Sequence, residues 1–138
     1  MKYKLTEETK VVNGHTLHRI VCVTAFASVS VGDIGGWVES ESNLSQYGNA
    51  WVYGDAEVCG NAKVCGNTYF IVLKNSWSSG RYFTYTASNK KFKVGCFYGT
   101  GEELIAKAYK DSELSGKCYE ASVKYVEEIE RLKKEQEK

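Results

Sequence analysis

Residues 47–70 consist of four tandem copies of a six-residue repeat with no residue between the copies. Each copy starts with Tyr or Cys, continues with Gly and Asn or Asp, and places Ala or Thr two positions before a final Val or Phe. A fixed short period is typical of solenoids, in which one repeat packs on the next. Six-residue repeats predict a left-handed β-helix, whose triangular coil uses three repeats, or about 18 residues.

The repeat assigns each of its positions to the inside or the outside of the coil. The final residue of each copy should point inward from a short strand, and so should the small fourth residue, because the interior is narrow near a corner. The inward residues are therefore Val52, Val58, Val64, Phe70, Ala50, Ala56, Ala62 and Thr68. Glycine with Asn or Asp should form the corners, since these residues accept left-handed backbone.

Stacking and exposure follow from the same period. Residues 18 apart should stack, so that Val52 lies on Phe70 and Ala50 lies on Thr68. The fifth position varies freely, which predicts outward side chains for Trp51, Glu57, Lys63 and Tyr69.

The repeat array is too short to be stable alone. Four copies make about one and a third coils, and a solenoid usually needs about three repeating units. Residues 33–46 are expected to add degenerate copies, because Val38 and Leu44 fall in phase with Ala50. Open strand edges are normally covered or paired. We therefore expect the N-terminal hairpin, the C-terminal part or a second copy to complete the coil, and we expect a homo-oligomer, in the simplest case a dimer.

The N-terminal stretch predicts a β-hairpin. Asn13-Gly14 separates two β-prone runs, at residues 10–12 and 16–23, and this dipeptide is a strong hairpin signal. Both histidines, His15 and His18, lie in the hairpin on opposite faces. We expect neither catalysis nor metal binding from them. The five cysteines contain no Cys-x-x-Cys pair, so no zinc site is expected.

The second half of the chain predicts a sheet followed by helices. Residues 69–74, 81–86 and 91–97 read as three antiparallel strands. Thr100 and Glu103 form a capping box for a helix from Gly101 to about Lys110. A second helix is expected from about Gly116 to Glu135. The stripe expected to pack on the sheet consists of Cys118, Ala121, Ser122, Tyr125, Val126, Ile129 and Leu132.

The chain is therefore expected to be mainly β with α. Residues 1–70 should form the hairpin and a short left-handed-type β-helix stub, and residues 71–138 a three-stranded antiparallel sheet with two C-terminal helices. The formal net charge of +1 provides no global field for nucleic acid or an anionic membrane. No apolar run approaches the ~18 residues of a membrane span. The first residues contain no apolar signal core, so we expect a cytosolic protein with free thiols.

Two segments resemble proteins of phages and prophages. Gly35-Gly36-Trp37-Val38-Glu39, followed by Gly-Asn-Ala and Gly-Asp-Ala repeats, resembles bacterial and prophage proteins of uncharacterised role and, more distantly, polymer-forming β-helix proteins. Phe83-Thr84-Tyr85-Thr86 and Gly95-Cys96-Phe97-Tyr98-Gly99-Thr100, before an acidic helix start, resemble a small module of phage-encoded proteins. The resemblance covers about residues 30–130 and implies a phage or prophage source, with no catalytic residues to transfer.

The turn Gly99-Thr100-Gly101 is a candidate anion contact. It joins a strand to a helix N-terminus, where free backbone amides and the helix dipole attract negative charge. The alternative is that Thr100 only caps the helix, with Glu102 and Glu103 repelling a phosphate. We favour the cap because the loop contains no Lys or Arg.

Aromatic residues on the strands are candidate stacking partners for a base. Arg81 and Tyr85 share one face of a strand, and Trp77 precedes them in a serine-glycine loop. If the turn at residues 99–101 follows the neighbouring strand, all of these residues converge at one end of the sheet and form a nucleotide site. The alternative is that the aromatic side chains form the buried face of the sheet.

These features predict a non-enzymatic phage accessory protein, without cofactor or metal, that binds a host molecule in the host cytosol. As a counter-defence protein it would either sequester a small nucleotide signal or inhibit a host defence protein. Two alternatives remain. Hexapeptide-repeat acyltransferases share the coil, although their long arrays and catalytic histidine after many coils are missing here. A structural polymer-forming protein is the other.

Overall fold

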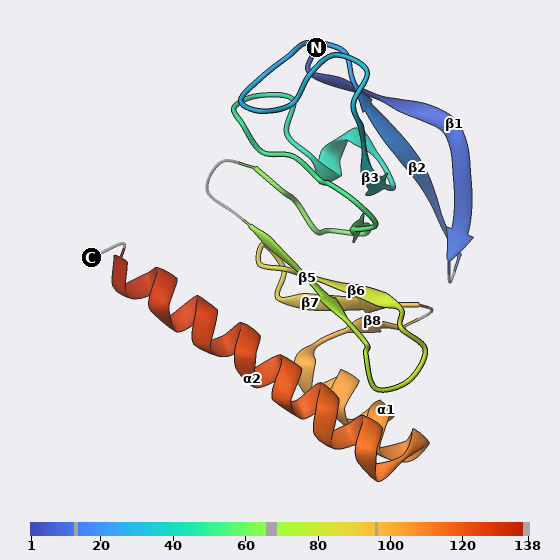
Figure 1. Cartoon of the computed structure of the whole chain (residues 1–138), viewed down its shortest axis with the longest axis vertical. Coiled ribbons are helices and arrows are strands. Elements are labelled where there is room, and N and C mark those ends of the chain that lie inside the picture. The colour runs from blue at the N-terminus through green and yellow to red at the C-terminus, as the bar shows by residue number, and fades with distance from the viewer. Residues whose placement is uncertain (13, 66–68, 96, 137–138) are drawn as a thin grey trace.

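The computed structural model describes residues 1–12, 14–65, 69–95 and 97–136, and these form two open four-stranded sheets and two helices (Figure 1). The N-terminal lobe contains β1 (Tyr3–Val12), β2 (His15–Cys22), β3 (Ile34–Val38) and β4 (Glu57–Val58), in that order across the sheet. β1 and β2 pair antiparallel, which confirms the predicted hairpin. β3 and β4 pair parallel. A short 3-10 helix, η1 (Glu41–Asn43), follows β3.

The repeats supply the core of the N-terminal lobe largely as predicted. The buried inward residues are Val52, Ala56, Val58, Ala62 and Val64, joined by Val38 and Leu44 from the preceding segment. Gly48, Gly54 and Gly60 at the corners have φ values of 60–72°, the left-handed backbone that the repeat predicts. Ala50 and Phe70 are only partly buried, and Thr68 lies outside the described residues.

The pairing between turns of the chain differs from the prediction. Val38 aligns with Val58, and Leu44 with Val64, so each parallel pair is 20 residues apart in the sequence and not 18. Val38 and Leu44 therefore do not share a phase with Ala50. The reason is the spacing of the buried residues, because Leu44 and Val52 are eight residues apart and not six, which moves the preceding segment out of register with the repeats by two residues.

The described residues form open sheets and not a stack of complete coils. Phe70, expected to end the fourth repeat inside the coil, instead begins β5 (Phe70–Lys74) and pairs with Thr86 of the second sheet. Trp51 also departs from its predicted outward position. It is half-buried, and its ring packs edge-on against Phe26 and Tyr3, at centroid distances of 5.5 and 6.4 Å.

The C-terminal lobe contains four strands where three are predicted. β5 is followed by β6 (Tyr82–Thr86), β7 (Lys91–Val94) and β8 (Phe97–Gly99), all antiparallel in that order. The expected strand at residues 91–97 is divided because Gly95 adopts a left-handed φ of 54°. The chain reverses there, and Val94 pairs with Phe97 in a tight hairpin. The direction of the chain after Gly95 is thus opposite to the one predicted.

Two helices cover one face of the second sheet (Figure 1). α1 (Gly101–Asp111) starts at the predicted capping box, in which Glu103 N–H donates to Thr100 Oγ1 and Thr100 N–H donates to Glu103 Oε1. α2 (Glu113–Gln136) begins three residues before its predicted start. The core between helices and sheet consists of Phe83, Tyr85, Phe92, Leu104, Ala108, Tyr119, Val123 and Val126.

The face of α2 that packs on the sheet agrees only in part with the prediction. Val126 of the predicted stripe is buried and Cys118, Ser122 and Ile129 are half-buried, whereas Ala121 is exposed and Tyr125 and Leu132 are 54% and 45% exposed. The other buried residues, Gly116, Tyr119 and Val123, are not in the predicted stripe. Only Ser112 separates the two helices, so α1 sets the rotation of α2. The helices approach closely where Gly116 lies against the ring of Tyr109, since an added Cβ there would lie 2.3 Å from ring carbons.

The two lobes are joined by direct hydrogen bonds. Glu57 N–H donates to Thr84 Oγ1 at 3.2 Å, and Lys63 N–H donates to Ser88 Oγ at 2.6 Å. Neither α1 nor α2, nor any shorter helix in the described ranges, has the length and apolar composition that crossing a membrane requires.

Candidate functional site

A groove of about 440 Å³ lies between the lobes. We call it the interlobe groove; it is lined by Lys10, Val11, Val12, Asp55, Glu57, Arg81, Tyr82 and Gly95. A hollow of about 230 Å³ lined by Tyr53, Gly54, Asp55, Val72 and Tyr82 adjoins it and shares Asp55 and Tyr82 with it. The surface exists only because the strand ends of both lobes meet.

The floor of the interlobe groove is an ion-pair network centred on Glu57. Lys10 Nζ lies 2.5 Å from one carboxylate oxygen of Glu57, and Lys93 Nζ lies 3.4 Å from the other. Lys93 is 3% exposed and also donates to the carbonyl of Gly95. Lys10 packs over the ring of Trp37 at 4.4 Å. These charges satisfy one another and hold the lobes together, so they stabilise the groove more than they attract a ligand.

The rim of the groove offers one cation and several exposed side chains. Arg81 makes no side-chain hydrogen bond or ion pair with a described residue, and its guanidinium lies against the Cα of Gly95. Tyr82 is 48% exposed, Tyr53 57% and Val11 70%. Tyr and Arg are the residue types that most often anchor protein interfaces.

The predicted nucleotide site is divided between the two ends of the sheet. Tyr85, Thr100 and Gly101 line one hollow of about 320 Å³ beside Gly99, whereas Arg81 lies at the opposite end of β6. The predicted convergence is wrong because the hairpin at Gly95 reverses the chain. That reversal carries Gly99-Thr100-Gly101 away from Arg81 and toward the end of β6 where Thr86 lies.

The environment of Tyr85 is that of a core residue. Tyr85 is 2% exposed, its hydroxyl donates to Glu130 Oε2 at 2.6 Å, and its ring packs on Phe92. Burial raises the pKa of Tyr85, with the bonded Glu130 carboxylate adding to the effect. Glu102, Glu127 and Glu130 line the same hollow with one cation, Lys90, whose Nζ lies 2.9 Å from Glu130 Oε2, so carboxylates outnumber cations there and oppose a phosphate.

Trp77 also belongs to the core of the C-terminal lobe. It is half-buried in the loop before β6, and its ring makes edge contacts with Phe83 and Tyr119 at centroid distances of 6.5 and 4.9 Å. It lies apart from the hollow that contains Tyr85.

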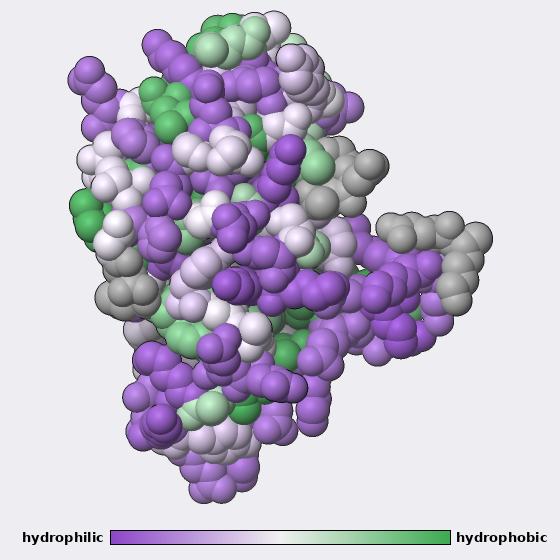
Figure 2. Space-filling model, turned by 180° about the vertical axis from the view of Figure 1, so that it is seen from behind, coloured by the Kyte–Doolittle hydropathy of each residue, from purple (hydrophilic) through white to green (hydrophobic). Residues whose placement is uncertain are grey.

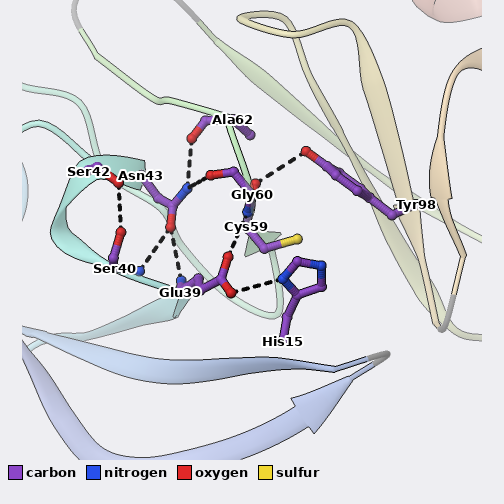
Figure 3. Close-up of polar contacts among 9 residues, drawn as sticks. All are labelled: His15, Glu39, Ser40, Ser42, Asn43, Cys59, Gly60, Ala62 and Tyr98. Atoms are coloured by element: carbon purple, nitrogen blue, oxygen red, sulfur yellow. Dashed lines mark hydrogen bonds and ion pairs between the residues drawn. The ribbon is translucent and has the colours of Figure 1, made fainter.

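A polar cluster beside the hairpin includes His15 and is the arrangement closest to a catalytic one (Figure 3). His15 Nδ1 lies 2.9 Å from Glu39 Oε2, and the other oxygen of Glu39 accepts from Gly60 N–H at 2.8 Å. The bond to His15 is the main cause that lowers the pKa of Glu39. Cys59 and Tyr98 lie next to this pair, and the Tyr98 hydroxyl donates to the carbonyl of Cys59.

Burial disfavours the reactive form of the thiol in this cluster. Cys59 is 1% exposed, and burial raises its pKa to about 11. A protonated thiol reacts poorly, because the thiolate is the reactive form. His15 lines none of the hollows described above.

The hydrogen bonds of Asn43 give much of this polar cluster a structural role. Asn43 is 1% exposed; its amide oxygen accepts from the N–H groups of Glu39 and Ser40, and its amide nitrogen donates to the carbonyls of Gly60 and Ala62 (Figure 3). It therefore ties neighbouring turns of the chain together. Sequence reasoning missed Glu39 and Asn43, although Glu39 follows the conspicuous Gly35-Gly36-Trp37-Val38 run.

No three His, Cys, Asp or Glu side chains in the part of the chain that the structure describes are grouped to hold a metal ion. Comparison of the sequence with models of protein families and with curated proteins found no match. The resemblance to phage and prophage proteins therefore stays a prediction from the sequence.

Proposed function

We propose that this chain is a non-enzymatic phage accessory protein that binds a host protein in the host cytosol, as a counter-defence protein. The observation that carries the proposal is the interlobe groove with its adjoining hollow, where Arg81, which forms no ion pair with a described residue, lies beside the exposed Tyr82, and the exposed Tyr53 lines the hollow. An exposed cluster of aromatic and Arg side chains around a concave surface is the composition of an interface hot spot.

A host protein is favoured over a nucleotide signal as the target. A nucleotide needs a cation or free amides for its phosphate and an accessible ring for its base. The hollow at the helix N-terminus is lined by Glu102, Glu127 and Glu130, its one cation, Lys90, is paired with Glu130, and Tyr85 in its wall is buried. Arg81, the cation expected to meet the phosphate, lies at the other end of the strand.

Affinity capture from lysate of the bacterial host tests the proposal. The bait proteins are the native chain, Tyr82→Ser, Arg81→Ala and, as a matched control away from the groove, Tyr47→Ser at a position 84% exposed. We expect one protein to be retained by the native chain and the control and lost with both groove variants. Equal retention by all four baits would contradict the groove as the binding surface. Heat release with a panel of mono-, di- and cyclic nucleotides would instead support the nucleotide target.

We further propose that the repeats form a short left-handed β-helix completed by a second copy of the chain. A partly apolar hollow of about 470 Å³ lies at the end of the repeat segment, lined by residues that include Ala50, Trp51, Val64 and Phe70. The long exposed face of α2 is a weaker candidate for the surface that binds a second copy. Figure 2 shows hydrophilic residues over its projecting end, and ion pairs within the helix, such as Glu120–Lys124 and Arg131–Glu135, satisfy its charges. Sedimentation as a monomer at high micromolar concentration would contradict the dimer, and filaments would favour the polymer-forming alternative.

The His15–Glu39 pair favours one alternative function. A carboxylate bonded to Nδ1 orients an imidazole for general-base catalysis, as an acyltransferase-like protein requires. Turnover of acetyl-CoA that His15→Ala abolishes and His18→Ala spares would support this alternative. Absence of turnover in the native chain, with a panel of amine and hydroxyl acceptors, would remove it.

A further inference from the structure

The second sheet ends on an edge strand that carries few of the usual protections. β5 stands last in the strand order, so it pairs with β6 on one side and leaves its other edge outermost. Natural edge strands are usually blunted by charged side chains, a bulge, proline or a short length. Residues 70–73 of β5 are all apolar and pair with β6 in unbroken register, and the only charge of the strand is Lys74 at its end.

The other sheet edges are blunted in these ways. β1 is irregular between Leu5 and Thr9, and it bears exposed charges at Lys4, Glu7 and Glu8. β4 contains two residues, and β8 contains three. Among the edges formed by the described residues, the outer edge of β5 is therefore the one that a further strand can join most readily.

The register determines which main-chain groups point away from β6. Just after β5, Asn75 N–H donates to the Arg81 carbonyl at 2.8 Å. Hydrogen bonding alternates along an antiparallel pair, so the main-chain groups of Phe70 and Val72 are directed outward. No residue in the described ranges hydrogen-bonds to the N–H or the carbonyl of Phe70 or Val72. These outward groups are the donors and acceptors that the main chain of an added strand would satisfy.

Two hollows lie beside β5. One is the hollow of about 230 Å³ next to the interlobe groove, which is lined by Val72 together with Tyr53 and Tyr82. The other is the hollow of about 470 Å³ at the end of the repeats, which is lined by Phe70 together with Trp51. The rings of Tyr53 and Phe70 are in contact, with centroids 5.0 Å apart. The two hollows are therefore neighbours, and the β5 residues that line them are two positions apart.

An added strand would reach both hollows with alternate side chains. Residues of that strand directly opposite Phe70 and Val72 would place their side chains on the same face of the sheet as these two. This face packs against the core of the N-terminal lobe, whereas Ile71 and Leu73 pack against the core beneath the helices. Main-chain hydrogen bonds combined with hollows for alternate side chains are the features by which proteins bind an extended segment as an extra strand.

We propose that an extended segment of the host protein binds as an additional strand, antiparallel to β5 on its outer edge. One apolar side chain of the segment enters the hollow of Tyr53 and Tyr82, and an aromatic side chain two residues later enters the larger hollow of Trp51. The inference rests on the proposed function, because the first hollow shares Asp55 and Tyr82 with the interlobe groove. The second hollow is also where a second copy is proposed to complete the repeats, so the segment and the second copy compete for it.

Titration of the full, ¹⁵N-labelled chain with a short blocked peptide, followed by NMR, tests the edge directly. The probe is acetyl-Lys-Thr-Leu-Thr-Trp-Thr-Lys-amide, in which Leu and Trp share one face of a strand. We expect saturable shifts of the main-chain amides of Phe70 and Val72.

Two control peptides separate the main-chain bonds from the side chains. N-methylation at Leu and Trp removes the N–H groups that would face β5, and a peptide with Leu and Trp adjacent directs them to opposite faces. Each should bind about tenfold or more weakly than the probe. No saturable shift with the probe, or equal binding by the N-methylated peptide, would overturn the proposal.

Two substitutions at one position assign the binding to β5. Val72→Pro removes the outward N–H and no hydrogen bond to β6, which is where an edge strand accepts proline. Val72→Thr keeps the N–H and the branched shape. The probe should bind about tenfold or more weakly to Val72→Pro and should still bind to Val72→Thr, with folding of both variants checked by circular dichroism. Undiminished binding to a folded Val72→Pro would overturn the proposal, and if that variant does not fold, the N-methylated peptide on the native chain decides.

Capture from host lysate separates this inference from the proposed function. Loss of the host protein with both Tyr82→Ser and Val72→Pro would support the two together. A host protein lost with Tyr82→Ser and retained by a folded Val72→Pro would overturn strand addition and leave the proposed function standing. Binding of the probe with no host protein captured would contradict the proposed function and keep the edge of β5 as a site for an extended segment.

Discussion

The two lobes relate to their sequences in opposite ways. In the N-terminal lobe, the repeat pattern identifies the buried residues almost one by one, yet the pairing between turns of the chain is shifted by two residues. In the C-terminal lobe, the start of α1 and its cap are where the sequence places them, yet the face of α2 and the direction of the last strand are not.

This difference between the lobes shows which structural features a local sequence pattern can predict. Burial in the repeats depends on the size and polarity of each side chain, and both can be read directly from the sequence. The rotation of α2 depends on contacts between elements, such as Gly116 against Tyr109 and the packing of Val123 in the core, which only the assembled structure reveals. The comparison can be tested by substituting residues whose burial the sequence predicts and residues whose contacts only the structure shows.

The largest effect is expected from Ala56→Glu in the N-terminal lobe. Ala56 is fully buried among apolar side chains, and an unpaired carboxylate there costs several kcal/mol. We expect this variant not to fold, as judged by circular dichroism. Tyr47→Glu, at an exposed position of the same repeats, should change the stability by no more than about 0.5 kcal/mol. An unchanged melting temperature for Ala56→Glu would show that the inward assignment is wrong.

The junction between the lobes should give the next largest effect. Glu57→Gln leaves Lys93 buried without its carboxylate and should destabilise the chain by about 3 kcal/mol. Because Glu57 belongs to β4 and Lys93 to β7, urea unfolding should keep one transition at a lower midpoint. Glu8→Gln on the exposed part of β1 is the control. A loss confined to one lobe, seen as two transitions, would show that the lobes fold independently.

The orientation of α2 predicts a contrast between two neighbouring residues. Val123→Ser removes a core contact and should cost about 2–3 kcal/mol, whereas Tyr125→Ser should stay within about 0.5 kcal/mol. Chemical denaturation of both variants measures the contrast. A larger loss of unfolding free energy for Tyr125→Ser than for Val123→Ser would mean that the face predicted from the sequence is the buried one. If that face is buried in a dimer, the sedimentation of Tyr125→Ser would change as well.

The smallest effect is expected from the pH dependence of the His15–Glu39 pair. Glu39 has a lowered pKa in the folded chain, so its ionised form stabilises the fold above its ordinary pKa of 4.5, and this contribution is lost as the pH falls below it. Glu39 is one-third exposed, which limits the effect to less than about 1 kcal/mol. Urea midpoints at about pH 6 and about pH 3.5 should differ less in Glu39→Gln than in the native chain. If the urea midpoint shifts equally between these pH values in Glu39→Gln and in the native chain, Glu39 is not the source of the shift.

The candidate site, like the fold, contains some residues that the sequence predicts and others that only the tertiary structure brings together. Arg81 and Tyr82 are adjacent in the sequence, and Arg81 was recognisable there as a cation beside aromatic residues. Their neighbours in the interlobe groove, such as Lys10 and Asp55, come from distant segments that no local pattern connects.

The sequence by itself determined most of the buried residues of the repeats, where the hairpin turns and where α1 begins. Each of these follows from side-chain size, backbone freedom or a cap within a few residues. The tertiary structure alone decided which valine pairs with Val38, which face of α2 meets the sheet, and at which end of the sheet Gly99-Thr100-Gly101 lies. The physical reason is that pairing, rotation and chain direction depend on contacts between segments far apart in the sequence, and one left-handed glycine, Gly95, is enough to reverse the outcome.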